Sequence, residues 1–248
     1  MRTRGYREAT TRGEGMHSLS CAAMCVIAFT LWSSSSVTAS RDTSDLSEEN
    51  ASAVSFSDEG SLKEYRGYRR MHAWSERGQE AWLEAYTELK DGQFAYRVIS
   101  ERGSDMIRSR VLRTVLDRER ALINAGDTDK ADLTPENYEF GDITVDADGS
   151  QSVPLKPRRK DVLLVDGRMV LTPDGRDVVR VEGRLAKNPS FWTSLVNIVR
   201  RFASIGGVRV PVSTETTAKI KFIGTSQLEV AYEYDSVNGR PVGNIASR

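Results

Sequence analysis

The chain has 248 residues, enough for one sizeable domain or two small ones. Lysine and arginine together number 35, and so do aspartate and glutamate, so the formal net charge is zero. This balance excludes the strong overall charge that draws a protein to nucleic acid or to an anionic membrane. Short basic runs such as 158–160 have acidic neighbours, which is typical of a solvated face.

The first forty residues differ from the rest of the chain. Four arginines precede an apolar run over 19–32, and serines and small residues then lead to Ala39. A basic start, a short apolar core and a small-residue exit are typical of a secretory signal peptide, and this core is short for a membrane span. We therefore predict that residues 1–39 are removed on export. An uncleaved anchor is the alternative, and translation starts at either Met1 or Met16.

Both cysteines, Cys21 and Cys25, lie in the apolar run, so we expect the exported protein to have no thiol and no disulfide. Neither follows a convincing lipobox, which makes a lipoprotein the weaker option. The next stretch, 40–60, is rich in serine and acidic residues and has little apolar surface to bury. It is expected to be a flexible lead-in to the folded domain.

We expect organised structure to begin near Ser61 with a short helix. Leu62, Tyr65 and Met71 are spaced at helical intervals, and Ser61 suits the N-cap position. From His72 onward the apolar period changes to two, which indicates strands.

The pair Asp91-Gly92 is the strongest hairpin signal in the sequence. A two-residue turn there sets Lys90 opposite Gln93, and the register follows along both strands. A slip of one residue would move each side chain to the opposite face. The predicted apolar face carries Leu83, Ala85, Leu89, Phe94, Tyr96 and Val98.

The segment 104–125 has the clearest helical pattern. Its apolar residues form one stripe, while charged residues occupy the remainder. Ser104 can cap the start, and Gly126 suits the C-terminal cap. Such a helix needs an apolar surface to lie on, most simply the sheet. The main stripe consists of Ile107, Val111, Val115 and Leu122, with Leu112, Leu116 and Ile123 beside it.

The stretch 127–152 is polar and contains an acidic turn at 146–150. Its opening Asp-x-Asp-Gly is similar to that of a calcium loop. The later acidic ligands and the closing glutamate of such a loop are absent from the sequence, so we interpret this segment as an ordinary acidic turn.

After Pro157 the sequence returns to strands, with apolar residues at every second position. Asp-Gly pairs at 166–167 and 174–175 predict two tight turns. Turns so close together indicate an antiparallel meander, because parallel strands need long crossovers. Pro211 has no amide donor, so its strand is expected to be an edge or to carry a bulge there. Further breaks are expected at Asn188-Pro189, Gly206-Gly207 and Asn238-Gly239.

The sequence lacks the familiar catalytic and metal-binding patterns. His72 is the sole histidine after the predicted leader, which leaves no Cys-His pair and no multi-histidine metal site. No Gly-x-Ser-x-Gly elbow, phosphate-binding glycine loop or dinucleotide fingerprint is present. The carboxylate pairs Glu84/Glu88 and Glu229/Glu233 permit glycosidase chemistry, but such pairs are common on amphipathic sheets. We predict a protein that is not an enzyme and binds no metal or cofactor.

A curved antiparallel sheet crossed by an amphipathic helix can hold an apolar ligand between its layers. The alternative is that the helix fills this space and the layers form an ordinary core; the residues alone leave the two about even. A ligand space would be lined by the inward strand positions and the helix stripe. These residues are Leu83, Ala85, Phe94, Tyr96, Val98, Ile107, Val111, Val115, Leu122, Leu228, Val230 and Tyr232.

The order of these segments, with an exported start, resembles the LolA-like superfamily of periplasmic carriers, whose members bind lipids or lipoproteins. The motifs that carry the resemblance are YRGYRRM (65–71), AWLEAYTEL (81–89), VVRVEGRL (178–185) and IGGVRVPVSTETTAKIKFIG (205–224). RVEGRLAKNPSFWT and GVRVPVSTETTA are similar to an uncharacterised group of secreted bacterial proteins in that superfamily. The resemblance covers most of 61–242, and its motifs are structural rather than catalytic.

The resemblance implies an incomplete β-barrel wrapped around helices, with a hydrophobic cavity that in the carriers holds acyl chains in transit. A related branch of the superfamily senses envelope signals by protein contact. The long polar stretch 127–152 and the crowded charges on the strand faces depart from the carriers. No position here matches their functional arginine or lid residues.

We therefore expect an α+β fold: a large curved antiparallel β-sheet, an incomplete barrel, wrapped around amphipathic helices. A single domain is expected over 61–242, followed by a tail at 243–248. The expected protein is monomeric, periplasmic and non-enzymatic, and binds a lipid or the acyl chain of a lipoprotein but no nucleic acid. An envelope protein is considered as a further partner. The alternative function is a protein-interaction or sensor module in envelope homeostasis, with a filled core.

Overall fold

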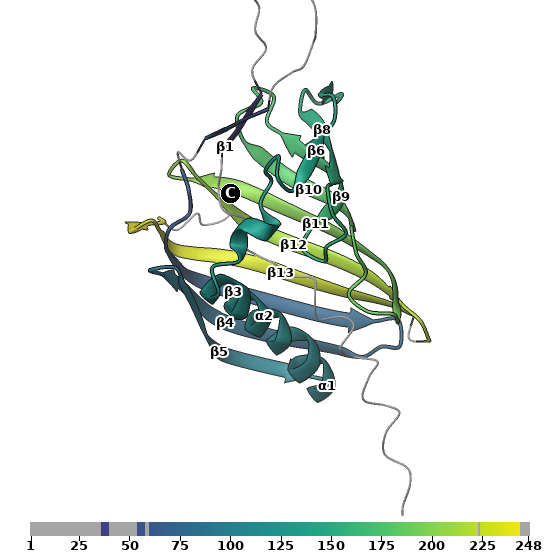
Figure 1. Cartoon of the computed structure of the whole chain (residues 1–248). Helices are drawn as coiled ribbons and strands as arrows, with labels where there is room; N and C mark the ends of the chain where they lie inside the picture. Colours follow the sequence, from purple (N-terminus) through teal and green to yellow (C-terminus); the bar gives the residue numbers. More distant parts are fainter. Residues whose placement is uncertain (1–35, 40–53, 58–59, 223, 244–248) are drawn as a thin grey trace, which may run out of the picture.

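The computed structural model describes residues 36–39, 54–57, 60–222 and 224–243 (Figure 1). Antiparallel strands make up most of this part of the chain. The strands are β1 (Ser36–Ala39), β2 (Val54–Ser57), β3 (Tyr65–Ser75), β4 (Glu80–Lys90), β5 (Gln93–Gly103), β6 (Tyr138–Phe140), β7 (Thr144–Val145), β8 (Gln151–Pro157), β9 (Val165–Leu171), β10 (Val178–Leu185), β11 (Thr193–Ile205), β12 (Val208–Ile220), β13 (Gly224–Val237) and β14 (Arg240–Pro241).

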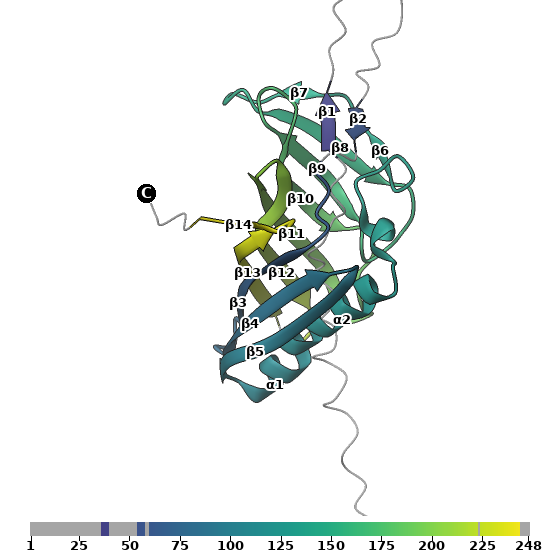
Figure 2. The same ribbon diagram turned by 90° about the vertical axis from the view of Figure 1, so that its left-hand side faces the viewer.

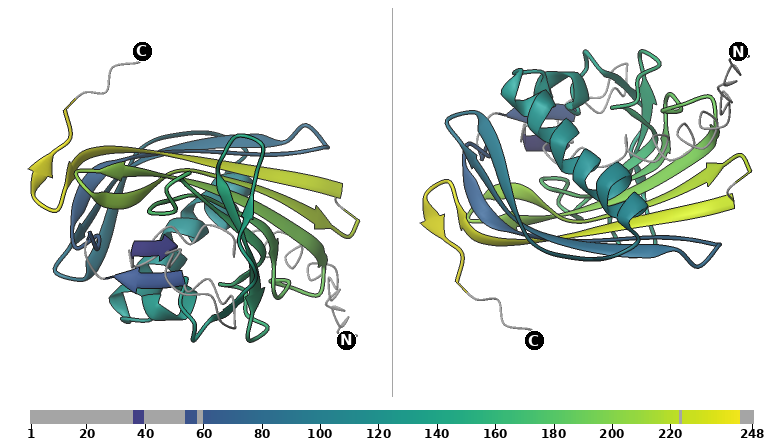
Figure 3. Two further views of the ribbon diagram at one scale, coloured as in Figure 1. Left: turned by 90° about the horizontal axis from the view of Figure 1, so that it is seen from above. Right: turned by 90° about the horizontal axis from the view of Figure 1, so that it is seen from below.

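The main sheet has 12 strands and is not closed, because its end strands β5 and β6 do not pair with each other. Its order is β5-β4-β3-β13-β12-β11-β10-β9-β8-β6, with β14 beside β13 and β7 beside β8. The sheet is strongly curved, and the long helix lies on its concave side (Figures 2 and 3). The large curved antiparallel sheet predicted from the sequence is thus confirmed.

A separate two-stranded ladder joins β1 to β2, with Ala39 opposite Val54. The strand β1 ends at the predicted cleavage residue, and β2 falls within the predicted lead-in. The remainder of the predicted leader, and most of the lead-in, lie outside the described residues, as do all but one residue of the tail.

The helix expected at 61–71 is wrong, because this segment enters strand β3 at Tyr65. Every second residue of the strand turns to the concave face, so Tyr65, Arg69, Met71 and Ala73 are buried between β13 and β4. The spacing of Tyr65, Tyr68 and Met71 also fits a helix, but Tyr68 is 40% exposed on the outer face. The buried period of two therefore decides the structure.

The Asp91-Gly92 hairpin is confirmed in its turn and in its register. Asp91 and Gly92 have φ angles of 51° and 70°, the left-handed conformations that a two-residue hairpin turn requires. Lys90 lies opposite Gln93, and Ala85 lies opposite Val98, as predicted. The predicted apolar face points inward, with Tyr96 and Val98 only partly buried.

The predicted helix over 104–125 is confirmed as one continuous helical segment: α1 (Asp105–Ile107), a π-helical turn η2 (Arg108–Leu112) and α2 (Arg113–Asn124). The Gly126 and Asp127 amides donate to the Ile123 and Leu122 carbonyls, which is the Schellman arrangement expected for a glycine cap. The Ser104 side chain does not cap the start. A short 3₁₀ turn, η3 (Thr128–Ala131), follows.

The turn predicted at Asp166-Gly167 is wrong, because both residues lie within strand β9. Gly167 pairs with Gly183 of β10, and a Cβ atom on Gly167 would lie 2.1 Å from the Glu182 carbonyl oxygen. Glycine is therefore needed here for the close approach of two strands rather than for a turn.

The other predicted turns are confirmed. The Gly175 amide donates to the Thr172 carbonyl between β9 and β10, and the Gly149 amide to Asp146 in the acidic turn. Pro211 sits at a bulge, where the register of β12 against β11 shifts by one residue. The breaks at 188–189, 206–207 and 238–239 join β10 to β11, β11 to β12 and β13 to β14.

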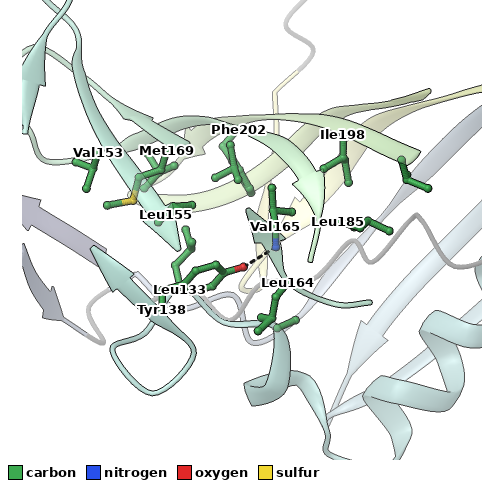
Figure 4. Packing of buried hydrophobic residues seen from close by; sticks show 14 of the residues in the cluster. Leu133, Tyr138, Val153, Leu155, Leu164, Val165, Met169, Leu185, Ile198 and Phe202 are labelled. Atoms are coloured by element: carbon green, nitrogen blue, oxygen red, sulfur yellow. Dashed lines mark hydrogen bonds between the residues drawn. The ribbon is translucent and has the colours of Figure 1, made fainter. Parts of the chain in front are cut away.

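Two hydrophobic clusters fill the concave side of the sheet. The helix-side cluster packs α1, η2 and α2 on β3, β4, β5 and β13; the loop-side cluster packs the segments 131–140 and 162–165 on β8 to β12. The loop-side cluster is drawn in Figure 4 and contains Ala131, Leu133, Tyr138, Val153, Leu155, Leu164, Val165, Met169, Leu171, Val178, Val181, Leu185, Val196, Ile198, Phe202, Ala218 and Ile220.

Candidate functional site

The residues predicted to line a ligand space come together on the concave face, in the helix-side cluster. Most are buried core residues: Leu83 is 1% exposed, Ala85 0% and Phe94 1%. The same cluster holds Ile107, Val111, Val115, Leu228, Val230 and Tyr232, with Tyr96 and Val98 packed at its margin.

Leu122 is the exception among the predicted lining residues, because it is partly exposed and does not belong to the cluster. The buried face of α2 is rotated from the predicted stripe and is formed by Val115, Leu116, Glu119 and Ile123. The Asn124 side chain at the end of α2 accepts a hydrogen bond of 2.7 Å from the Phe94 amide, which ties the helix to the free edge of β5.

An ion pair between Arg69 and Glu119 lies buried inside the helix-side cluster. Arg69 Nη2 donates to Glu119 Oε1 at 2.9 Å, and Nη1 contacts Oε2, so the contact is bidentate. Arg69 Nη2 also donates to the Tyr65 hydroxyl at 2.5 Å. The guanidinium carbon lies 5.0 Å from the Phe94 ring centre and 5.1 Å from that of Tyr232. This pair connects β3 of the sheet to α2 through the middle of the core.

The electrostatics of this pair follow from its burial. Burial raises the pKa of the Glu119 carboxyl above its ordinary value, and the attraction of Arg69 and Arg200 opposes the shift. Burial also raises the pKa of the Tyr65 hydroxyl. The ion pair is therefore sustained by its bidentate geometry against a substantial desolvation cost.

A polar strip, here called the seam, separates the two clusters on the concave face. Strand β12 places the buried residues Thr214 and Thr216 there, between apolar residues of β11 and β13. The Thr216 hydroxyl is buried and has no hydrogen-bond partner within the described part of the chain. Burial lowers the pKa of Arg200, which lies on β11 opposite Thr214. The seam consists of Arg69, Glu119, Arg200, Thr214, Thr216 and Tyr232.

The sequence reading missed the seam because its charged members look like surface residues. Arg69 stands in a run of arginines, and Glu119 stands between two of them. A period of two over 65–73 would have placed Arg69 on the same face as Met71. A helical spacing of four would likewise have placed Glu119 beside Val115 and Ile123.

The outer face of the sheet carries a second polar feature, a shallow hollow of about 510 Å³ over β13, β3, β4 and β5. His72 stacks between Trp74 and Trp82, with ring centres 4.6 Å and 4.5 Å away. This confirms the aromatic neighbourhood expected for His72, although the residue lies within its strand and not at its start. The Arg102 guanidinium covers the Trp82 ring at 4.3 Å.

The carboxylate pairs of the outer face are largely engaged in ion pairs. Glu84 and Glu233 both bind Arg70, and Glu88 binds Arg66 at 2.7 Å. Among the described residues, no group of three or more histidine, cysteine, aspartate or glutamate side chains is placed to hold a metal ion. Within the same ranges, no helix has the length and apolarity needed to cross a membrane.

Comparisons of the chain with protein-family models, with curated proteins and with solved structures gave no match. The function is therefore argued from the site itself.

Proposed function

We propose that the protein is an exported, non-enzymatic binding protein for a hydrophobic ligand, a lipid or an acyl chain, in the bacterial periplasm. The observation that carries the proposal is the concave face of the open sheet, where two apolar clusters meet at a polar seam. An apolar surface with a few convergent polar groups is the usual composition of a small-molecule site.

In this proposal the acyl chain lies along the concave face where the clusters meet, and the helix-side and loop-side cores form its two walls. The polar end of the ligand is placed at the seam, near Thr214 and Thr216. The buried Thr216 hydroxyl supports this placement, since a buried polar group without a partner costs about 1–3 kcal/mol of stability. A ligand that bonds this hydroxyl would recover that cost.

A fluorescent fatty acyl probe tests the placement. Thr216→Trp fills the seam and should abolish probe binding, while Thr217→Trp on the outer face of the same strand should leave binding unchanged. Thr216→Val keeps the side-chain volume, removes the hydroxyl and should fold normally but bind the probe more weakly. Unaltered binding in both Thr216 variants would contradict the placement, and a wild-type protein that binds no acyl probe would contradict the function.

Export is part of the proposal and has its own test. The basic, apolar and small-residue order of residues 1–39 supports removal of this segment. N-terminal sequencing of protein recovered from the cell envelope should begin near Ser40. A product that still contains residues 19–32 would contradict cleavage.

A second candidate function is a protein-interaction or sensor module with a filled core. It is favoured by one observation: most of the predicted lining residues are packed against α2 and its π-helical turn, and Ala85 is fully buried. Ala85→Trp tests this directly, because overpacking a filled core costs about 1–3 kcal/mol. Full stability of this variant would show that space remains between helix and sheet; a loss of stability together with no acyl binding would favour the second candidate.

A further inference from the structure

Three aromatic side chains gather at one end of the sheet, where the β10–β11 and β12–β13 connections meet (at the right in Figure 1). Phe191 and Phe222 are 79% and 80% exposed, the most exposed of the large apolar residues in the described part of the chain. Trp192 links them, with ring centres 5.6 Å from Phe191 and 5.9 Å from Phe222. Phe191, Trp192 and Phe222 are here called the aromatic tip.

The backbone at Phe222 is strained in a way that keeps its ring in solvent. Its φ angle is 66°, a left-handed conformation that is rare for a bulky residue. The Phe222 carbonyl accepts a hydrogen bond from the Arg77 guanidinium, which holds the turn in place. Asparagine or glycine would suit this backbone better, so the presence of phenylalanine indicates a use for the exposed ring.

Cations surround the aromatic tip. Lys221 Nζ lies 4.2 Å from the centre of the Phe191 ring, and Arg77, Lys187 and Lys219 are exposed on the same loops and strand ends. Glu76 and Glu80 are the carboxylates on these segments, so four positive charges face two negative ones. Glu76 is ionised, because a hydrogen bond from Thr225 lowers its pKa.

We propose that the aromatic tip is a membrane-docking surface that inserts Phe191 and Phe222 into the interface of an anionic lipid bilayer. Aromatic rings favour the membrane–water interface, and neighbouring lysines are attracted to anionic headgroups. Lysine is depleted from protein–protein interfaces, so the ring of cations argues for lipid rather than for a protein partner. The attraction is local, which is compatible with a chain of zero net charge. This inference does not depend on the proposed ligand.

Vesicle binding by the full chain tests the proposal, with phosphatidylcholine vesicles compared with vesicles that also contain phosphatidylglycerol. The double variant Phe191→Ala/Phe222→Ala should weaken binding roughly tenfold or more, because each ring no longer leaves water. Lys221→Gln should weaken binding to the anionic vesicles about fivefold at low ionic strength and should have less effect at high ionic strength. Val145→Ser on β7 is the matched control, since Val145 is 60% exposed and lies outside the aromatic tip.

Two further measurements separate insertion from misfolding and from the apolar run at 19–32. Phe222→Asn should reduce vesicle binding without lowering the melting temperature, because asparagine tolerates the left-handed backbone. A photoactivatable lipid should crosslink to peptides containing Phe191, Trp192 or Phe222. Equal binding by wild type and the double variant, no vesicle binding by wild type, or crosslinks confined to other peptides would overturn the proposal.

Discussion

The two halves of the concave face are covered in different ways. Over β3, β4 and β5 the cover is a helix, which satisfies its own backbone hydrogen bonds and needs the sheet only for its side chains. Over β8 to β12 the cover is irregular chain at 131–140 and 162–165, whose backbone groups must find partners elsewhere. The comparison predicts that the helix half is sensitive to buried charge and the loop half to hydrogen bonds between side chains and backbone.

The loop half shows these bonds plainly. The Asn137 amide group donates to the carbonyls of Asp129 and Asp132, both at 2.8 Å, and Arg158 donates to the Pro135 carbonyl at 2.6 Å. The Val165 amide donates to the Tyr138 hydroxyl at 3.0 Å, which is the dashed contact in Figure 4. Side chains here do the work that backbone ladders do in regular elements.

Glu119→Gln should have the largest effect, because it leaves the buried Arg69 without its counter-charge. Removing one member of a buried ion pair costs about 3–5 kcal/mol, and urea unfolding measures this loss. The double variant Arg69→Met/Glu119→Leu should recover most of it, since an apolar pair of similar volume needs no compensation. Glu215→Gln, which breaks the exposed Arg201–Glu215 pair, is the control and should change little. A small loss in Glu119→Gln would show that the ion pair does not connect helix and sheet.

Truncation of one core side chain in each half should show that both are equally well packed. Phe94→Ala should cost about 3–5 kcal/mol and Leu155→Ala about 2–5 kcal/mol, because each leaves a cavity where a side chain is now at most 2% exposed. Equilibrium unfolding in denaturant measures both. A much smaller cost for Phe94→Ala alone would place open space beneath the helix.

Tyr138→Phe should have a smaller effect that is specific to the loop half. It leaves the buried Val165 amide without an acceptor, which costs about 1–3 kcal/mol. Amide hydrogen exchange at Val165 should rise with it. Tyr68→Phe, on a ring that is 40% exposed on the outer face, provides the control. Unchanged exchange at Val165 would mean that the loop cover does not depend on this bond.

The smallest effect is expected for Glu101, which joins β5 to the helix through Arg108 and Arg113. A hydrogen bond from Arg113 lowers the pKa of the Glu101 carboxyl. Because the folded pKa lies below the unfolded value, this contribution is present above the unfolded pKa and is lost as the pH falls through the folded pKa. Side-chain NMR titration should show the lowered pKa, and Arg113→Gln should bring it back towards its ordinary value; a pKa that Arg113→Gln leaves unchanged would rule out this cause.

Local turn chemistry made part of the fold predictable. The Asp91-Gly92 pair fixed the register of two strands because the turn type and the alternation of apolar residues agree. The same dipeptide at Asp166-Gly167 was misread, since nothing within the segment distinguishes a turn from a close contact with Gly183 on another strand. The helix expected at 61–71 failed for a similar reason: only the pairing with β13 and β4 reveals which of its residues face inward.

The candidate site was predictable in its apolar part and not in its polar part. Apolar periodicity located the residues that meet in the helix-side cluster, with Leu122 as the error. The Arg69–Glu119 pair joins residues 50 positions apart, and each stands among other charged residues in the sequence. Such a pair becomes visible only when the fold brings the two segments together.

Native mass spectrometry of protein gently recovered from the cell envelope tests the central claim most directly. The account predicts a lipid that copurifies with the protein and is displaced by excess fatty acid, and a lower occupancy in Thr216→Val than in wild type. A single ligand-free mass in wild type, together with no uptake of added fatty acid, would contradict a ligand site on the concave face.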